Sequence, residues 1–163
     1  MKTKIIQILS HSPGSKAYEA EKNDVEPTLG SSNPEIDYEN IFKIPNKPWW
    51  AGFFQKDWHV QFSQKVLEMS DNYVIECWRP YCGIKEIYSK KINGIMHRIF
   101  PSIRIKIGRF RSQDFCYKMI SELKRESKKN NILIHLQGHH EGLPYAIARE
   151  LGHLPIVASH LSG

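Results

Sequence analysis

The hydrophobic pattern of this chain alternates between short apolar runs, typical of buried strands, and longer runs with helical spacing. Strand-like runs cover residues 4–9, 73–78, 131–136 and 154–159, and the first and third of them are almost continuously apolar. Continuous apolar strands are typical of parallel sheets, because such sheets are buried on both faces. The pattern therefore favours a mainly parallel sheet.

A hairpin is predicted in the middle of the chain. Residues 85–92 and 95–100 flank Asn93-Gly94, which is the strongest short signal for a tight hairpin turn. Residues 104–107 then alternate basic and apolar side chains. This segment is expected either to extend the sheet or to lie across it.

Three amphipathic helices are predicted from apolar residues at helical spacing. The first begins after Asp57, the second begins at Ser112 or Asp114 and ends near residue 129, and the third ends at Gly152 in the C′ position. Their predicted buried stripes are Trp58, Phe62, Val66 and Met69; Phe115, Met119 and Leu123; and Leu143, Ile147 and Leu151.

The last third of the chain reads as strand, tight turn, helix and strand. Such a βαβ unit implies a parallel sheet covered on both faces. The sequence therefore predicts one α/β domain over residues 1–163, a Rossmann-like three-layer sandwich with a mostly parallel sheet. Residues 10–48, rich in Pro, Gly and Ser, are expected to form a long loop.

Composition restricts the class of protein. The 163 residues are 40% hydrophobic and 25% charged, and no apolar run approaches the roughly 18 residues of a membrane span. Three cysteines are an odd and sparse set, which argues against a disulfide scaffold and fits a reducing compartment. We therefore expect a cytoplasmic location.

Positive charge is concentrated in one segment. Residues 79–129 hold 14 Lys and Arg against four acidic residues, so this segment carries +10 while the whole chain carries +6. Such a field favours phosphate-bearing partners, namely anionic lipid, nucleic acid or a nucleotide. A solvated face opposite an acidic loop would give the same count.

Histidines follow two of the predicted strands, where α/β proteins bind ligands. His139 and His140 come after residues 131–136, and His160 comes after residues 154–159. Adjacent parallel strands would bring these strand ends together at the carboxyl edge of the sheet. The alternative is that the three histidines are turn, cap and loop residues.

Common metal and cofactor motifs are missing. After His140-Glu141 a zinc-protease motif would need a second histidine where Pro144 stands. The glycine-rich dinucleotide fingerprint, the Walker lysine and the nucleophile elbow are also missing, and Gly14 is the only glycine close behind the first strand. We expect no metal and no cofactor.

Three stretches resemble the N-terminal domain of a GT-B fold glycosyltransferase of the family 4 (group 1) type. Residues 91–101 look like the family's hairpin, and residues 132–138 look like its apolar strand with a histidine and a polar end. Residues 143–160 look like its small-residue helix, followed by Gly-x-Pro, an apolar strand and a histidine. The match covers most of the chain and implies the acceptor-side half of a two-domain enzyme.

The resemblance implies transfer of a sugar from a nucleotide-sugar donor to a glycan or lipid-linked acceptor, in the assembly of a cell-surface glycan. It implies His160 as the catalytic residue over the transferred sugar, with Gly14, His139, His140 and Glu141 around the acceptor. The donor site and the Glu-x7-Glu motif of the family belong to a second domain. This chain alone is therefore expected to be inactive.

Other partners and functions remain open at this point. The basic segment with its interleaved aromatic residues also fits a nucleic-acid-binding module, and the histidine cluster also fits a metal-dependent hydrolase. We further predict that an anionic membrane surface at the inner face of the membrane contacts Arg98, Arg104, Lys106, Arg109 and Arg111. Alternatively, the isoleucines between these cations are core strand positions and the cations only solvate an outer face.

Overall fold

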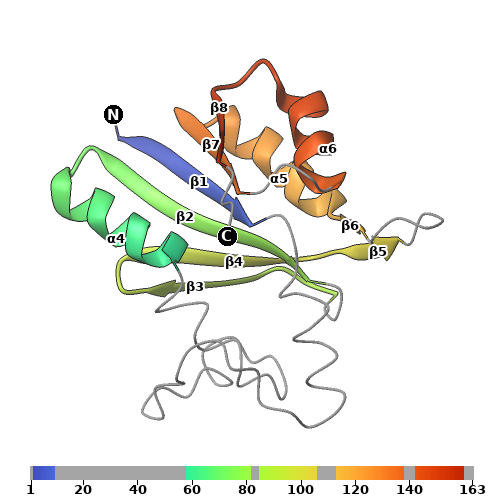
Figure 1. Cartoon of the computed structure of the whole chain (residues 1–163), viewed down its shortest axis with the longest axis horizontal. Coiled ribbons are helices and arrows are strands. Elements are labelled where there is room, and N and C mark those ends of the chain that lie inside the picture. Colours follow the sequence, from blue (N-terminus) through green and yellow to red (C-terminus); the bar gives the residue numbers. More distant parts are fainter. Residues whose placement is uncertain (1, 10–57, 82–84, 106–112, 138–141, 160–163) are drawn as a thin grey trace, which may run out of the picture.

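The computed structural model describes residues 2–9, 58–81, 85–105, 113–137 and 142–159. These ranges form an α/β fold with a six-stranded sheet, a separate two-stranded ribbon and three helices (Figure 1). The strands of the sheet are β1 (Thr3–Leu9), β2 (Tyr73–Tyr81), β3 (Tyr88–Ile92), β4 (Ile95–Pro101), β7 (Ile132–Gln137) and β8 (Ile156–Ser159). The ribbon is β5 (Ile103–Ile105) and β6 (Gln113–Phe115), and the helices are α4 (Trp58–Met69), α5 (Tyr117–Ser127) and α6 (Gly142–Leu151).

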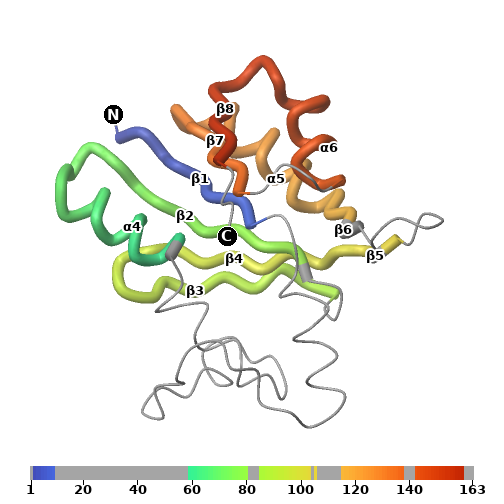
Figure 2. The backbone as a smooth tube through the Cα atoms, viewed as in Figure 1, coloured from blue at the N-terminus to red at the C-terminus, as the bar shows by residue number. Residues whose placement is uncertain are grey.

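The strands of the sheet lie in the order β3-β4-β2-β1-β7-β8, and all neighbours are parallel except the β3–β4 pair. From β1 the chain builds outward through β2 and β4 and then crosses back to β7 and β8 on the other side (Figure 2). The order of the strands therefore reverses between β1 and β7. The predicted mostly parallel α/β sheet is confirmed, and this order is compatible with a Rossmann-like fold.

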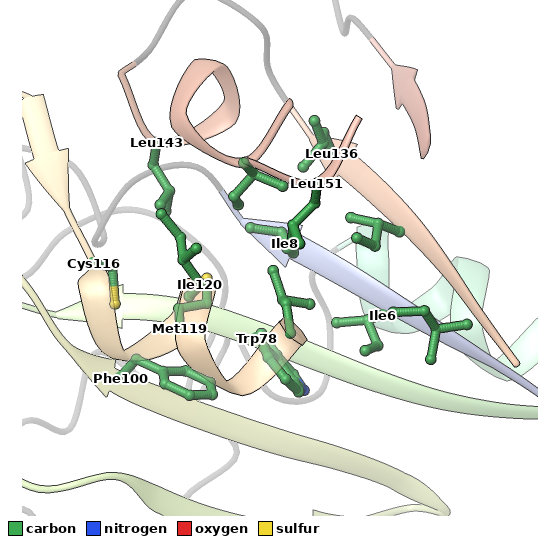
Figure 3. Close-up of a cluster of buried hydrophobic side chains, with 14 residues drawn as sticks. Ile6, Ile8, Trp78, Phe100, Cys116, Met119, Ile120, Leu136, Leu143 and Leu151 are labelled. Atoms are coloured by element: carbon green, nitrogen blue, oxygen red, sulfur yellow. The ribbon is translucent and has the colours of Figure 1, made fainter. Parts of the chain in front are cut away.

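The main hydrophobic core lies between the sheet and the helices α5 and α6 (Figure 3). Ile6 and Ile8 of β1 pack there with Trp78 and Phe100, whose rings lie 4.8 Å apart. The helices contribute the following buried side chains: Met119, Ile120, Leu123, Leu143, Ile147 and Leu151. The predicted apolar faces of α5 and α6 are confirmed, apart from Phe115, which belongs to β6.

A charged group closes this core beside β1. The ammonium of Lys4 lies 2.9 Å from a carboxylate oxygen of Glu76 and 2.7 Å from one of Glu126. The other Glu76 oxygen accepts a hydrogen bond of 2.8 Å from the indole nitrogen of Trp78. These contacts pair polar side-chain groups of β1, β2 and α5 with one another where they are shielded from solvent.

Helix α4 covers the opposite face of the sheet, with a different side inward from the one predicted. Phe62 and Met69 of the expected apolar stripe are 44% and 83% exposed, whereas His59, Val60 and Ser63 are fully buried. The sheet beneath α4 presents polar side chains, so the helix turns toward it the side that can form hydrogen bonds with them. The prediction of a buried Phe62–Met69 stripe is wrong.

The hairpin at Asn93-Gly94 is confirmed. Asn93 has φ of 49° and Gly94 has φ of 84°, and Ile92 and Ile95 are paired on either side of the turn. Both turn residues need positive φ in the tight turn that suits the twist of two antiparallel strands. This sequence signal is local, which is why it could be read directly.

The start of α5 differs from the prediction. Cys116 occupies the N-cap position without a capping hydrogen bond, since its thiol donates to the Pro101 backbone oxygen over 3.3 Å. Asp114 lies in β6 opposite Arg104 of β5. The predicted caps Ser112 and Asp114 are therefore wrong, because residues 113–115 pair as a strand before the helix begins. Residues 104–107 were expected either to extend the sheet or to lie across it. The described part, residues 104 and 105, belongs to the ribbon and lies outside the main sheet.

Gly152, directly after α6, is needed for space rather than for a left-handed conformation. The helix ends before Gly152, as predicted, but among the described glycines only Gly94 has the positive φ typical of a C′ glycine. A Cβ at Gly152 would lie 2.6 Å from the carbonyl oxygen of Ala148. The backbone there leaves no room for a side chain.

We expect Gly152→Ala to lower the free energy of unfolding by about 1–3 kcal/mol, the usual cost of forcing an extra carbon into a packed position. The measurement is urea unfolding followed by circular dichroism. His153→Ala, at the exposed neighbouring residue, is the control and should change little. Equal stability of Gly152→Ala and the native chain would contradict this account.

Candidate functional site

A row of polar side chains crosses the sheet beneath α4. Gln7 of β1 is the register partner of Cys77 on one side and of His135 on the other, and Cys77 is in turn the partner of His97. Register partners on adjacent strands point to the same face of a sheet. We name Gln7, Arg79, His97, His135, Gln137 and Ser159, with His59 and Ser63 of α4, the polar row.

The centre of the polar row is a set of hydrogen bonds that joins α4 to the sheet. The Gln7 amide nitrogen donates to the Ser63 hydroxyl and to the backbone oxygen of His59, the latter over 3.3 Å. Ser63 itself donates to the His59 oxygen over 2.7 Å. The Gln7 amide oxygen accepts a hydrogen bond from the Gln137 amide nitrogen. Three side chains from β1, β7 and α4 and the backbone oxygen of His59 thus fix one another.

The half of the polar row toward β4 contains basic groups that are kept mostly uncharged. Arg79 lies with a guanidinium nitrogen 3.2 Å from Nε2 of His59. Because a guanidinium only donates, Nε2 of His59 accepts, and this ring is neutral. Burial, followed by the positive charge of Arg79, lowers the pKa of His97 to about 3. His97 is therefore a neutral imidazole at physiological pH and not a proton source.

The half of the polar row toward β8 is closer to solvent. Nε2 of His135 lies 2.9 Å from the hydroxyl oxygen of Ser159, and both side chains are only partly buried. The ring of Phe62 meets the imidazole edge-on, with ring centres 5.9 Å apart. Burial lowers the pKa of His135, so this imidazole is neutral at pH 7. A hydroxyl, an imidazole and an exposed phenyl ring therefore lie together.

This half of the polar row lies at the carboxyl ends of β1, β7 and β8. Gln137 is the register partner of Leu9 and of Ser159, the last residues of their strands. Gln137 is only 6% exposed, yet its amide oxygen has no hydrogen-bond partner in the part of the chain that the structure describes. A buried acceptor without a donor is unfavourable by about 1–3 kcal/mol, so a ligand that donates here would be stabilised.

The strand order places these groups where ligands bind in α/β folds. The order reverses between β1 and β7, and crevices form at such switch points beyond the carboxyl ends of the strands. Leu9 and Gln137 are paired at this point. Both the location and the chemistry of the polar row therefore fit a ligand site.

Most of the predicted site residues lie outside the described residues. This holds for Gly14, His139, His140, Glu141 and His160, and for Lys106, Arg109 and Arg111. Their strands can be compared with the prediction, however. Gln137 and Ser159, which end β7 and β8, are register partners, so the expected meeting of these two strand ends is confirmed.

Arg98, expected to face an anionic membrane, points into the fold. Its guanidinium lies 2.8 Å from a Glu122 oxygen and 4.8 Å from the centre of the Trp78 ring, and the side chain is only 15% exposed. Phe100, one of the interleaved aromatic residues, is fully buried. Neither residue is part of an exposed basic surface.

Sequence reasoning missed most of the polar row. Its signal was present, since Gln7 interrupts an otherwise apolar strand and His135 and Gln137 alternate with apolar residues in β7. Polar side chains at alternate positions of a buried strand point to one face and have to find partners there. The predicted site rested on the histidines beyond the strand ends and not on the polar residues inside the strands.

The polar row is suited to hydrogen bonding rather than to metal chemistry. In the described ranges, no three His, Cys, Asp or Glu side chains are grouped so that they could hold a metal ion. The same ranges contain no helix long and apolar enough to cross a membrane. What the polar row offers at the carboxyl ends of β1, β7 and β8 are neutral amide, imidazole and hydroxyl groups.

The neutral state of His97 can be measured directly. We expect its imidazole to remain unprotonated from pH 8 down to pH 4.5, because its folded-state pKa is about 3 while an ordinary histidine titrates near 6.5. The unfolded chain binds this proton more readily, so stability should fall as the pH falls below 6.5. Nitrogen chemical shifts of the ring provide the readout. A midpoint near 6.5 in the folded protein would contradict the burial of His97.

Fold alone does not identify an activity, because α/β architectures carry many unrelated functions. The chemistry of the polar row at the switch point is the feature that bears on function. A scan against protein-family models and searches of curated proteins and of solved structures found no match for this chain.

Proposed function

We propose that this chain is the acceptor-side domain of a glycosyltransferase, which holds a sugar-bearing acceptor at the carboxyl ends of β1, β7 and β8. The observation that carries the proposal is the buried Gln137 amide oxygen, which has no hydrogen-bond partner among the described residues, beside the His135–Ser159 pair at the switch point. The resemblance of residues 91–101, 132–138 and 143–160 to family 4 enzymes points to the same reaction.

The chemistry of these groups suits a sugar. A hydroxyl both donates and accepts, so it can donate to the Gln137 oxygen and accept from the hydroxyl of Ser159. The neutral imidazole of His135 orients Ser159 through the 2.9 Å contact. Phe62 supplies an apolar surface for the C–H face of a sugar ring. None of these groups carries a charge that would select a charged ligand instead.

In the proposed reaction, an acceptor hydroxyl attacks the anomeric carbon of a nucleotide-sugar. The bond from that carbon to the phosphate oxygen breaks, the nucleotide leaves with the bonding electrons, and the hydroxyl proton passes to water. His160 would hydrogen-bond the transferred sugar and stabilise the charge that develops as the bond breaks. In the resembled family a second domain holds the donor, so we expect this chain itself to contribute acceptor contacts.

Binding of neutral methyl glycosides tests the proposal. We expect at least one of them to bind in the millimolar range in saturation-transfer NMR. Gln137→Ala should weaken binding about fivefold, the scale of one net hydrogen bond, and Phe62→Ala should weaken it by a similar factor. His153→Ala is the matched control, because His153 is exposed on the turn between α6 and β8.

Two results would contradict the proposed site. One is that none of the glycosides binds, and the other is that Gln137→Ala and Phe62→Ala bind as tightly as the native chain. Circular dichroism shows whether each variant is folded. Phe62 is 44% exposed, so its replacement leaves the core intact.

A further inference from the structure

A hollow lies on the other side of the sheet from the polar row. It is a groove of about 680 Å³ between α5, α6 and the β5–β6 ribbon, which lie next to one another in Figure 1. Its apolar lining includes Ile103, Phe115 and Tyr117. Ile103 is 70% exposed and Tyr117 is 82% exposed, which is unusual for large side chains at the mouth of one hollow.

The rim of this groove is strongly basic. Four of the residues that line it are Lys or Arg and one is acidic, Glu150. The ammonium of Lys118 donates to the backbone oxygen of Lys85 over 2.9 Å, which leaves two further N–H groups for a ligand. An anion at the rim would therefore meet several donors.

Glu150 occupies part of this positive field. Its carboxylate lies 2.8 Å from the Lys124 ammonium and 3.3 Å from the Arg149 guanidinium. These side chains are exposed, so both ion pairs are weak. Removing the carboxylate would free two cations at the rim without changing the apolar lining.

We infer that the α5–α6 groove binds a single-chain amphiphile with an anionic head group, such as an alkyl phosphate. The chain would lie along Ile103, Phe115 and Tyr117, and the head group would meet Lys118, Lys124 and Arg149. The volume is within the range of small-molecule sites, about 300–1,000 Å³. A hollow suits one inserted chain, whereas a membrane surface would be met by a protruding apolar surface.

The amphiphile inference goes beyond the proposed acceptor site and does not rest on it. Decyl phosphate, kept below its micelle concentration, is the probe, and calorimetry measures its affinity. We expect saturable 1:1 binding that weakens with added salt, because exposed charges are screened. Shortening the chain should weaken binding about fourfold for each buried methylene lost.

Variants that are expected to change the affinity in opposite directions distinguish binding in this groove from nonspecific binding. Arg149→Gln should weaken binding by about two- to fivefold, as for an exposed charge pair, whereas Glu150→Gln should tighten it. Ser121→Trp, at an exposed position that lines the groove, should abolish binding by filling the hollow. Lys65→Gln on α4 removes the same charge on the other side of the sheet and should have no effect.

Three outcomes would overturn the inference. If inorganic phosphate bound as tightly as decyl phosphate, the apolar lining would have no role in binding. Binding to anionic vesicles without any binding of monomeric decyl phosphate would indicate a membrane contact instead. Unchanged affinity in folded Arg149→Gln and Ser121→Trp variants would place the probe elsewhere on the protein.

Discussion

The buried amide of Gln7 is the constraint on which the arrangement of the polar face depends. Gln7 lies in β1, at the centre of the sheet, and is fully buried. Its donors and acceptor would each be unfavourable there without a partner. The partners come from α4 and from Gln137, so the same amide fixes the position of the helix and the side chain at the end of β7.

One face of the sheet supplies the main hydrophobic core, and the other carries the polar groups that we propose for binding. The face toward α5 and α6 supplies the main hydrophobic core, with charged side chains such as Lys4 and Glu76 beside it. Among the described residues, the face toward α4 combines apolar side chains, including a cluster of Val60, Cys77 and Ile95, with the polar row. Hydrophobic burial on the first face thus allows the second to carry polar groups that add little to stability by themselves.

The pairing of β7 with β8 connects this division to function. Parallel pairing brings the carboxyl ends of consecutive strands to one edge, so His135, Gln137 and Ser159 meet although α6 separates them in the chain. A polar cluster at a switch point is a common design of ligand sites in α/β proteins. The groove on the α5–α6 side has the opposite character, apolar inside and basic at its rim.

The sequence was sufficient for features with local causes. The Asn93-Gly94 turn, the continuous apolar strands and the βαβ unit each depend on neighbouring residues, and each was predicted correctly. The buried side of α4 was not predicted, because its polar partner Gln7 lies 52 residues before His59 and 56 residues before Ser63 in the chain. The helix start at Cys116 was missed for a similar reason, since Asp114 pairs with β5 instead of capping α5.

We propose that the polar row serves binding rather than stability. The double variant Gln7→Leu/Gln137→Leu tests that claim most directly, because it replaces both hydrogen-bonding partners while Ser63 keeps its bond to the His59 oxygen. The measurement is its free energy of unfolding in urea. We predict a value within about 1 kcal/mol of the native chain or above it, as expected when two buried polar partners are replaced together. A loss of about 3 kcal/mol or more would show that the polar row mainly holds the fold together and would contradict the account.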